Sequence, residues 1–355
     1  MKIYLVGGAI RDELLGIKSL EKDWVVIGSS AKEMLESGFI SVGKSFPVFL
    51  HPKTKEEYAL ARKEIKVELG HKGFKFDVNK DISLEEDLLR RDLTINAIAK
   101  SNEGEWIDPY GGIQDIENRI LRHISKAFSE DPLRVFRVAR FYCYLSKFNF
   151  EIHEDTLILM KELCNSEDLD NLSFERIWME TEKCLSLKNS YLYFEALHDV
   201  GASTVFSCDT NQFKKNLLKL KKTEVSNLDA QDKWAILTMN LELTDKVKIP
   251  NSFKKSALNF SNIIETLRNE NSPELLLEAI MKIDGFRNKK SALKTFNLYS
   301  LLVAESDALR KLNLNSLLGE LSKVKPNKNF DKDSNLIKKD IYEKRLSIIK
   351  KHFNE

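Results

Sequence analysis

The first third of the chain alternates short apolar runs with amphipathic segments, the pattern of strands connected by helices. The apolar runs predict strands at residues 2–7, 23–28, 39–43, 46–51 and 56–62. Helical spacing predicts helices at residues 9–16 and 30–38, the second with Ser30 as N-cap and Gly38 as C-cap. We therefore expect residues 1–124 to form an α/β segment with a mixed sheet.

From about Ser125 the apolar positions are spaced three and four residues apart, and this helical spacing continues to the end. The clearest helical segments lie at residues 131–148, 153–164, 174–187 and 190–201. The segments at residues 213–222 and 335–353 are rich in lysine and are predicted to be basic helices. The whole pattern predicts an α+β protein, with a mixed sheet in the head and an all-helical remainder.

Composition is typical of a globular protein, since 42% of the 355 residues are hydrophobic and 31% are charged. The formal net charge is only +2, so a nucleic-acid site must come from local clusters of lysine and arginine. The four cysteines form no C-x-x-C pair, which argues against zinc and redox motifs and favours a cytoplasmic protein. The charged start is not expected to be a secretory signal, and no apolar run approaches the roughly 18 residues of a membrane span.

The segment LVGGAIRD, residues 5–12, places two glycines between a predicted strand and a predicted helix. Glycine lets backbone N–H groups approach a phosphate, and Arg11, about one turn into the helix, can reach the same anion. Most glycine pairs of this kind are only turns. The segment therefore indicates an anion site only in combination with other motifs.

Glu21 and Asp23 stand two residues apart at the start of a predicted strand, where alternate residues face the same side. Nucleotidyl transfer commonly uses two divalent ions held by carboxylates: one activates the attacking hydroxyl and the other neutralises the triphosphate. Glu57, in the predicted strand at residues 56–62, is the candidate for a third acid. An isolated E-x-D pair is also a common solvated strand end, so both interpretations stay open at this point.

Two arginine-rich segments add further candidate chemistry. LEEDLLRRDLTINA, residues 84–97, and SEDPLRVFRVARF, residues 129–141, each combine acids and arginines around a predicted helix end. In the second segment, Asp131 and Pro132 form a helix start. The arginines that follow, spaced three residues apart, are Arg134, Arg137 and Arg140. Their apolar neighbours favour anion or base recognition over a solvated face, which would mix in lysine and glutamate.

Together these segments, in this order and spacing, resemble class II tRNA nucleotidyltransferases, the CCA-adding enzymes. The segments that carry the resemblance are LVGGAIRDELLG…EKDWVVIGSS, HPKTKEEYALAR, LLRRDLTINAIA…DPYGG and EDPLRVFRVARF. The resemblance covers roughly residues 1–205 and implies a polymerase-β-like nucleotidyltransferase head at 1–124. It further implies a helical neck and RNA-binding body at 125–205 and a helical tail that contacts tRNA at 206–355.

The implied activity is addition of C, C and A to tRNA 3′ ends from CTP and ATP without a nucleic-acid template. Carried over position by position, the implied nucleotide-binding residues are Gly8, Arg11, Arg91, Asp131, Arg134, Arg137 and Arg140. The implied magnesium ligands are Glu21 and Asp23, with Glu57 as our own candidate for a further catalytic acid. The implied partners are tRNA, CTP and ATP, with Mg²⁺ as cofactor and no membrane. The oligomeric state stays open between monomer and homodimer.

The base-reading role implied for Asp131 and Arg134 has a physical rationale. Cytosine and adenine both present an exocyclic amine beside an unprotonated ring nitrogen, whereas guanine and uracil present a carbonyl beside a ring N–H. A carboxylate that accepts from the amine and a guanidinium that donates to the ring nitrogen would select cytosine and adenine. The two residues are three apart on one predicted helix, so their side chains can project together.

Three features qualify the resemblance. The family's first metal acid is aspartate, and Glu21 in its place keeps open a catalytically impaired tRNA-binding protein. Larger relatives carry an HD-type phosphohydrolase domain, but the doublet His198–Asp199 has no other histidine nearby, so no metal site or phosphatase side activity is expected. The polar segment at residues 63–87 matches a loop that supports A addition, which favours complete CCA addition. Poly(A) synthesis and partial CC or A addition remain the same-chemistry alternatives.

Overall fold

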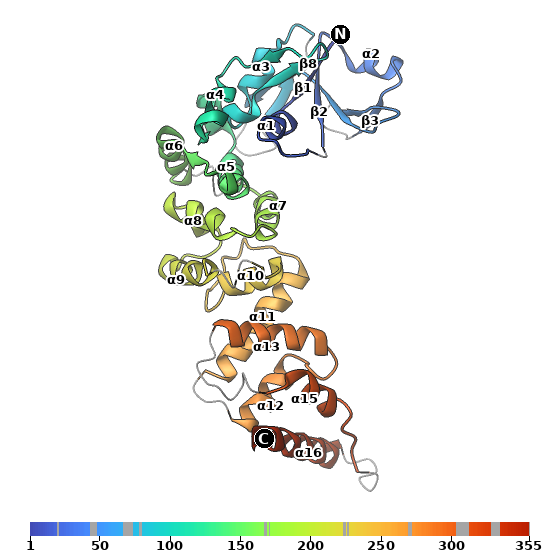
Figure 1. Cartoon of the computed structure of the whole chain (residues 1–355), viewed down its shortest axis with the longest axis vertical. Coiled ribbons are helices and arrows are strands. Elements are labelled where there is room, and N and C mark those ends of the chain that lie inside the picture. Colours follow the sequence, from blue (N-terminus) through green and yellow to red (C-terminus); the bar gives the residue numbers. More distant parts are fainter. Residues whose placement is uncertain are drawn as a thin grey trace. The chain divides into compact units, whose positions relative to one another are not determined.

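The protein is described by a computed structural model. The residues that it describes are 1–19, 21–42, 48–66, 74–77, 80–166, 169, 171–222, 225, 227–268, 272–302, 312–327 and 334–354. The chain divides into two compact units, Met1–Phe206 and Ser207–Glu355. Figure 1 shows that the strands of the sheet belong to the first unit and that the second unit is helical.

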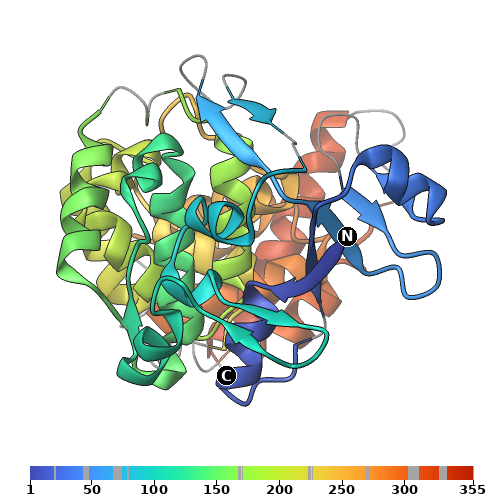
Figure 2. The same cartoon turned by 90° about the horizontal axis from the view of Figure 1, so that it is seen from above.

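The first unit is built on a mixed seven-stranded sheet in the order β3-β4-β5-β2-β1-β8-β9. Its strands are β1 Lys2–Val6, β2 Asp23–Ile27, β3 Ile40–Val42, β4 Val48–Leu50, β5 Glu57–Leu60, β8 Ala99–Ser101 and β9 Trp106–Ile107. Strands β2 and β5 run parallel, whereas the other neighbouring pairs run antiparallel. Figure 2 shows the N-terminal strand β1, in dark blue, inside this sheet. The predicted mixed sheet is confirmed.

Alternation along the central strands separates two apolar layers, because successive side chains of a strand point to opposite faces. On one face Val25 packs with Leu84 and Leu88 of the helix Leu84–Leu89, which precedes β8 in the chain. On the other face Val26 packs with Met34 and strand residues. The sheet is therefore covered on both faces, and Asp23 shares the face of Val25.

Eight helices accompany the sheet in the described part of the first unit. They are α1 Gly8–Leu14, α2 Ala31–Glu36, α3 Leu84–Leu89, α4 Gly112–Asn118, α5 Leu133–Leu145, α6 Glu154–Cys164, α7 Phe174–Leu185 and α8 Tyr191–Asp199. Ser30 caps α2 as predicted, and its hydroxyl and the Glu33 carboxylate form a reciprocal capping box. The predicted C-cap Gly38 lies one residue beyond the C-cap Ser37, with φ +85°, a conformation that glycine adopts without steric cost.

The predicted helical texture after Ser125 is confirmed by α5 to α8. Helix α5 buries Val135, Phe136 and Val138 and packs against α7 and α8. This packing determines which face of α5 carries its polar residues. Short two-residue strands, β10 Ile120–Leu121 and β11 Glu151–Ile152, pair in parallel beside α5. This packing makes α5 the helix around which residues 125–206 are arranged.

The described part of the second unit consists of helices joined by loops. Its helices are α9 Thr210–Leu220, α10 Ala230–Leu237, α11 Asn251–Thr266, α12 Pro273–Lys282, α13 Lys289–Leu302, α15 Leu314–Leu321 and α16 Ser334–Asn354. Helix α11 packs against α10, α12 and α13, and its buried Phe260 and Ile263 lie in the core of the unit. The predicted basic segments at 213–222 and 335–353 lie on α9 and α16.

The segment at residues 63–87 is only partly a loop. Strands β6 Lys63–Lys66 and β7 Phe74–Asp77 pair antiparallel in a two-stranded ribbon, and α3 begins at Leu84. Residues 67–73 and 78–79 lie outside the described residues, so the expected function of this segment stays a prediction.

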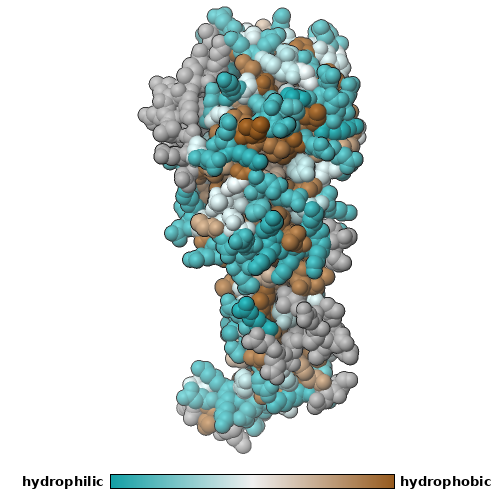
Figure 3. All heavy atoms as spheres, turned by 90° about the vertical axis from the view of Figure 1, so that its left-hand side faces the viewer, coloured by the Kyte–Doolittle hydropathy of each residue, from teal (hydrophilic) through white to brown (hydrophobic). Residues whose placement is uncertain are grey.

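Surface character agrees with the composition. On the face drawn in Figure 3, hydrophilic residues make up most of the surface, with hydrophobic residues set among them. Among the described residues, none of the helices has both the length and the apolar character that crossing a membrane requires.

Candidate active site in the first unit

Nearly all of the residues singled out in the sequence meet in one cavity of the first unit. The cavity has a volume of about 580 Å³ and is bounded by the ends of β1 and β2 and by α1, α5 and α7. The lining residues are Gly7, Gly8, Arg11, Glu21, Asp23, Arg62, Arg90, Arg91, Asp92, Asn96, Asp131, Leu133, Arg134, Arg137, Arg140, Phe141, Arg176 and Lys183. Nine of them are basic and four are acidic, so the cavity attracts anions.

The glycine pair forms the turn from β1 into α1 at the wall of this cavity. Gly7 has φ +74°, a conformation that side chains other than glycine rarely adopt, and its N–H donates to the Ile98 carbonyl at 3.3 Å. A Cβ atom on Gly7 would lie 2.9 Å from Nη1 of Arg91. The absence of a side chain therefore lets the Arg91 guanidinium come close to the backbone of the turn.

Arg11 is held in place from three directions. Its Nη1 donates to Oδ1 of Asn96 at 2.8 Å, and its Nη2 pairs with Asp12 at 2.7 Å. Its guanidinium carbon lies 5.0 Å from the ring centre of Phe141. With a side chain only 6% exposed, Arg11 presents a fixed charge to the cavity.

Glu21 and Asp23 both line the cavity, although only Asp23 belongs to a strand. β2 begins at Asp23, because its register partner Val6 is the last residue of β1 and the ladder ends there. The strand alternation used in the sequence argument therefore does not extend to Glu21. The segment before the strand brings its carboxylate to the cavity instead.

Glu57 lies beside Asp23 on the sheet. The two residues are register partners on the parallel strands β2 and β5, so their side chains share one sheet face. Glu57 is not among the residues that line the cavity. The neighbouring Glu56 points the other way, and its Oε2 accepts a hydrogen bond from Nε1 of Trp24 at 3.1 Å.

The two carboxylates lack a counter-ion in direct contact. In the described parts of the chain, neither the Glu21 nor the Asp23 carboxylate forms a hydrogen bond or an ion pair. Desolvation raises the pKa of Asp23, the Arg91 guanidinium opposes this, and the Glu21 carboxylate adds to it. Two acids that repel one another across a basic cavity favour a divalent cation between them, and carboxylate oxygens are the ligands that Mg²⁺ prefers.

Among the described residues, no third acid, histidine or cysteine is grouped with Glu21 and Asp23 as a metal ligand. Across the residues that the structure describes, no group of three or more His, Cys, Asp or Glu side chains is placed to hold a metal ion. Glu57 and the doublet His198–Asp199 therefore belong to no such group. The candidate metal centre therefore consists of Glu21 and Asp23, with the remaining positions left to substrate oxygens and water.

The segment after α3 supplies further charges. Asp87 is buried in α3 and pairs with both Arg90, at 2.8 Å, and Arg91, at 3.4 Å. Nη1 of Arg91 also donates to the Asn96 carbonyl at 3.4 Å. Its Nε is buried and has no partner within the described residues. Arg91 thus retains a donor for a bound ligand.

Asp92 connects this segment to α5. Its Oδ2 accepts from Nε of Arg137 at 2.7 Å, and its Oδ1 accepts from the Leu93 N–H and from Nδ2 of Asn96, both at 2.9 Å. Burial disfavours its charge, but the Arg137 guanidinium and the Asn96 amide hold the pKa of Asp92 well below its ordinary value. Asp92 therefore stays ionised and fixes Arg137.

The three arginines of α5 have different partners. Arg134 is buried and donates to the carbonyls of Ala127 and Arg90. Arg140 pairs with the buried Glu180 of α7. The guanidinium carbon of Arg140 also lies 4.1 Å from the ring centre of Phe141, against which Arg11 is placed. The guanidinium carbon of Arg137 lies 5.8 Å from the same ring centre, so three cations of the cavity lie near Phe141.

Asp131 caps α5 from one residue further out than predicted. The helix begins at Leu133 with Pro132 before it, and Oδ1 of Asp131 accepts from the Leu133 N–H at 3.1 Å. Its carboxylate pairs with Arg176 of α7 at 2.8 Å. Asp131 and Arg134 both line the cavity, but their side chains are held by other groups rather than by each other.

Two lining residues, Arg176 and Lys183, lie outside every motif that the sequence analysis quoted. Arg176, Glu180 and Lys183 are spaced four and three residues apart on α7, so they share one helical face. That spacing is readable in FERIWMETEK, residues 174–183. The sequence does not indicate, however, that this face of α7 packs toward α5.

Known proteins resemble this chain in sequence and in fold. A family model described as the poly A polymerase head domain matches residues 3–122, and one described as a probable RNA and SrmB-binding site of polymerase A matches residues 149–207. A Multifunctional CCA protein of Haemophilus influenzae (strain PittGG) is 50% identical over 279 residues, which are 78% of this chain and 66% of that protein. Residues 3–122 of this chain belong to the poly A polymerase head-domain family.

Two further relatives of this family are informative. A Multifunctional CCA protein of Mannheimia succiniciproducens is 55% identical over 202 residues, 57% of this chain and 48% of that protein. The chain thus spans about two thirds and about half of the lengths of these two curated relatives. A Bacillus stearothermophilus CCA-adding enzyme in complex with CTP has a TM-score of 0.64 at 25% identity, covering 90% of this chain and 77% of that one. The predicted resemblance to class II tRNA nucleotidyltransferases is confirmed for the family and the fold.

Proposed function

We propose that this chain adds C, C and A to the 3′ ends of tRNA, using CTP and ATP and no nucleic-acid template. The observation that carries the proposal is the single cavity that gathers two carboxylates, a set of fixed arginines and the pair Asp131 and Arg134. It is supported by relatives named Multifunctional CCA protein at 50% and 55% identity. It is also supported by similarity to a CCA-adding enzyme that binds CTP.

In this proposal Glu21 and Asp23 hold Mg²⁺. The ion supplies a lowered pKa for the attacking tRNA 3′ hydroxyl and neutralises charge on the triphosphate. The chain's own contribution is to place the two carboxylates at the mouth of β2, opposite the basic wall of the cavity. Glu57, beside Asp23 on the sheet, is proposed to support this end of the site as a further acid.

The triphosphate is bound by the arginines and by the glycine turn. Gly8 leaves the backbone open, since a Cβ atom there would lie 3.4 Å from Nη2 of Arg11. Arg11 and Arg91 flank that turn, and Arg137 and Arg140 approach from α5. Each of these guanidinium groups is held by a carboxylate or an aromatic ring, so binding a nucleotide does not require their ordering.

Asp131 and Arg134 read the base by the donor and acceptor pattern that cytosine and adenine share. Arg176 is proposed to position Asp131, because it occupies one side of the carboxylate and leaves other lone pairs for the exocyclic amine. Arg134 is fixed by two backbone carbonyls, which sets the direction of its remaining N–H groups. Selection thus depends on fixed groups of the protein and not on a template.

The remaining assignments follow from these. Residues 1–124 carry the chemistry, residues 125–205 bind the base and RNA, and residues 206–355 contact tRNA. The basic helices α9 and α16 suit sequence-independent contacts with phosphates, which an enzyme that accepts every tRNA requires. A cytoplasmic location is part of this proposal, because its substrates are intracellular molecules.

Poly(A) synthesis is the second candidate, because the family model that matches residues 3–122 bears the name of a poly A polymerase. The chemistry of transfer is the same, and only the number and identity of added nucleotides differ. Partial addition of CC or of A alone differs in the same way.

The test is incubation of the full chain with Mg²⁺, labelled CTP or ATP, and tRNAs that lack A, CA or CCA. Stepwise growth that restores each 3′ end and then stops supports the proposal. Long A tracts would indicate poly(A) synthesis, and growth that stops one or two nucleotides early would indicate partial addition. Bound tRNA with no incorporation would indicate an impaired binding protein and overturn the proposal.

A further inference from the structure

Arg11 of α1 lies against two aromatic rings of α5. Its guanidinium carbon is 5.0 Å from the ring centre of Phe141 and 5.6 Å from the ring centre of Tyr144. The two aromatic residues are three apart on α5, so they share one face of that helix. Phe141 lines the cavity, whereas Tyr144 does not, and Tyr144 also lies outside every motif found in the sequence. A role for Tyr144 in the site therefore has to come from its contact with Arg11.

The contact between Tyr144 and Arg11 depends on the ring and not on a charged oxygen. Burial raises the pKa of Tyr144, and the Asp12 carboxylate adds to this rise. The guanidinium groups of Arg11 and Arg140 oppose it without cancelling it. The phenol is therefore neutral at pH 7, and it attracts Arg11 through the electron-rich face of its ring. The Arg11 side chain is only 6% exposed, so water screens this attraction little.

The two rings differ in how many cations they serve. Phe141 is shared with two arginines of its own helix, whose guanidinium carbons lie 4.1 Å and 5.8 Å from its ring centre. Nζ of Lys147 lies 6.0 Å from the ring centre of Tyr144, but Lys147 is exposed and its charge is screened by water and salt. Arg11 therefore competes with other arginines for the ring of Phe141, and with a screened charge for the ring of Tyr144.

The rings leave the hydrogen-bonding edge of the Arg11 guanidinium accessible. Nε and Nη2 donate to Oδ1 of Asp12 at 3.0 and 2.7 Å, and Nη1 donates to Oδ1 of Asn96 at 2.8 Å. A guanidinium carries five N–H groups, so one N–H on each terminal nitrogen is left without an acceptor among the described residues. Because Arg11 lines the cavity, these two N–H groups form a fixed fork of the kind that phosphate oxygens accept from.

We propose that Tyr144 is a positioning residue: together with Phe141 it holds the Arg11 guanidinium from α5, so that its two remaining N–H groups meet the triphosphate. The inference rests on the proposed function, because it takes Arg11 to bind the triphosphate of the incoming nucleotide. Tyr144 itself touches neither nucleotide nor metal and acts through Arg11. Loss of the ring should therefore weaken nucleotide binding and leave the rate of transfer from the bound complex nearly unchanged.

The experiment compares two substitutions of Tyr144 in the full chain. Tyr144→Leu removes the ring, and Tyr144→Phe keeps the ring and removes only the hydroxyl. Each is made in the unaltered chain and in an Arg11→Gln background. The matched control is Tyr142→Leu, which removes another half-buried tyrosine of α5 that does not line the cavity. ATP binding is measured with Mg²⁺ and without tRNA, so that no transfer takes place. KM for ATP and kcat are then measured with a tRNA that lacks only its terminal A.

We expect Tyr144→Leu to weaken ATP binding and to raise KM for ATP about fivefold, with kcat changed by less than about twofold. Tyr144→Phe and the control Tyr142→Leu should bind ATP like the unaltered chain. In the Arg11→Gln background, Tyr144→Leu should cause no further loss, because the residue through which Tyr144 acts is already gone.

Three results would overturn the inference. They are ATP binding by Tyr144→Leu equal to that of the unaltered chain, binding by Tyr144→Phe as weak as that of Tyr144→Leu, and an equal loss from Tyr144→Leu in both backgrounds. The last of these is also what a general loss of folding would give. Failure of the proposed function is a separate result: an unaltered chain that binds ATP but does not restore CCA ends loses that function, while the binding comparison still decides the role of Tyr144.

Discussion

Asp131 shows which contacts of a site residue can be predicted from the sequence and which cannot. The segment EDPLR identified a helix start with an acid and an arginine three residues apart, and both side chains line the cavity. The partner that fixes Asp131 is Arg176, 45 residues away on α7, and no local pattern indicates it. Partners of this kind could not be predicted, because they depend on how two helices pack.

Replacing Asp131 with alanine is expected to relax discrimination against GTP and UTP by about 10- to 100-fold, because the acceptor for the exocyclic amine is lost. The measurement is incorporation of each of the four nucleotides in competition. Glu130→Gln, a neighbour that does not line the cavity, is the control. Unaltered selectivity in Asp131→Ala would contradict the base-reading assignment.

Glu21 is the residue at which this chain departs from the aspartate of the family it resembles. Because Glu21 and Asp23 both line the cavity without a counter-ion in the described residues, we expect both to be metal ligands. Glu21→Asp should preserve or raise the rate of transfer. Glu21→Ala should lower it on the order of 100-fold and raise the Mg²⁺ concentration needed for half-maximal rate.

The control for Glu21 is Glu36→Ala, an exposed acid of α2 that does not line the cavity. Rates are compared across a titration of Mg²⁺ with a tRNA that lacks only its terminal A. A Glu21→Ala variant with intact rate and intact Mg²⁺ dependence would show that Glu21 is not a ligand.

At the level of elements, the apolar pattern predicted β1 to β5 of the sheet, helices α5 to α9 and helix α16. It did not predict the short strands β8 and β9 of the same sheet, and it located none of the helices between α9 and α16 individually. The predicted start of β2 at Asp23 is confirmed, but the strand alternation assumed for Glu21 is wrong, because the ladder with β1 ends at Asp23. The apolar pattern also did not predict the ribbon of β6 and β7 in the polar segment at 63–87. Strand ends and ribbons depend on pairing with a distant segment, which the period of one segment does not contain.

The ion pair between Asp92, which follows α3, and Arg137 of α5 is expected to make the stability of the fold depend on pH. The folded pKa of Asp92 lies below its ordinary value of about 3.9, so its stabilising contribution is fully present above that pH. The contribution is lost as the pH falls below about 4 and approaches the folded pKa. The chain should therefore lose free energy of unfolding through this window, in addition to losses from other acids.

Asp92→Asn removes this contribution and leaves Arg137 without its carboxylate. The variant should be less stable at pH 7 by about 1–3 kcal/mol and should lose less stability than the unaltered chain between pH 5 and pH 3. Urea unfolding across this range measures both effects. Parallel pH profiles for the two chains would contradict the assigned role of Asp92.

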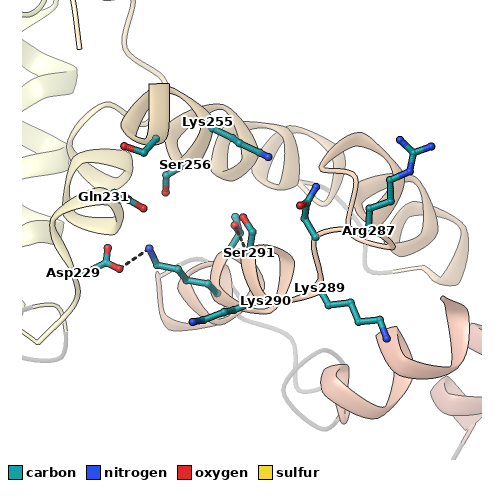
Figure 4. Close-up of a pocket in the computed structure, with 12 residues that line it drawn as sticks. Asp229, Gln231, Lys255, Ser256, Arg287, Lys289, Lys290 and Ser291 are labelled. Carbon is teal, nitrogen blue, oxygen red and sulfur yellow. Dashed lines mark hydrogen bonds and ion pairs between the residues drawn. The ribbon is translucent and has the colours of Figure 1, made fainter. Parts of the chain in front are cut away.

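For the whole molecule, the motifs that identify the family are confined to residues 1–205, and the helical second unit carries no comparable signature. A pocket of this unit is lined by Asp229, which caps α10, by Lys255 of α11 and by Lys289 of α13 (Figure 4). It could not be predicted, because these residues are separated by long stretches of sequence. Net charge gives no help, since +2 over the chain conceals local clusters. The folded arrangement is what brings these charges together.

The most direct test of the account is the sequence of the product's 3′ end. The full chain is incubated with Mg²⁺, all four nucleoside triphosphates at equal concentration and a tRNA that lacks CCA, and the 3′ ends are then sequenced. The account predicts that C, C and A are added in that order, that G and U are excluded, and that growth stops there. Ends that carry A tracts, that include G or U, or that remain unextended would contradict it.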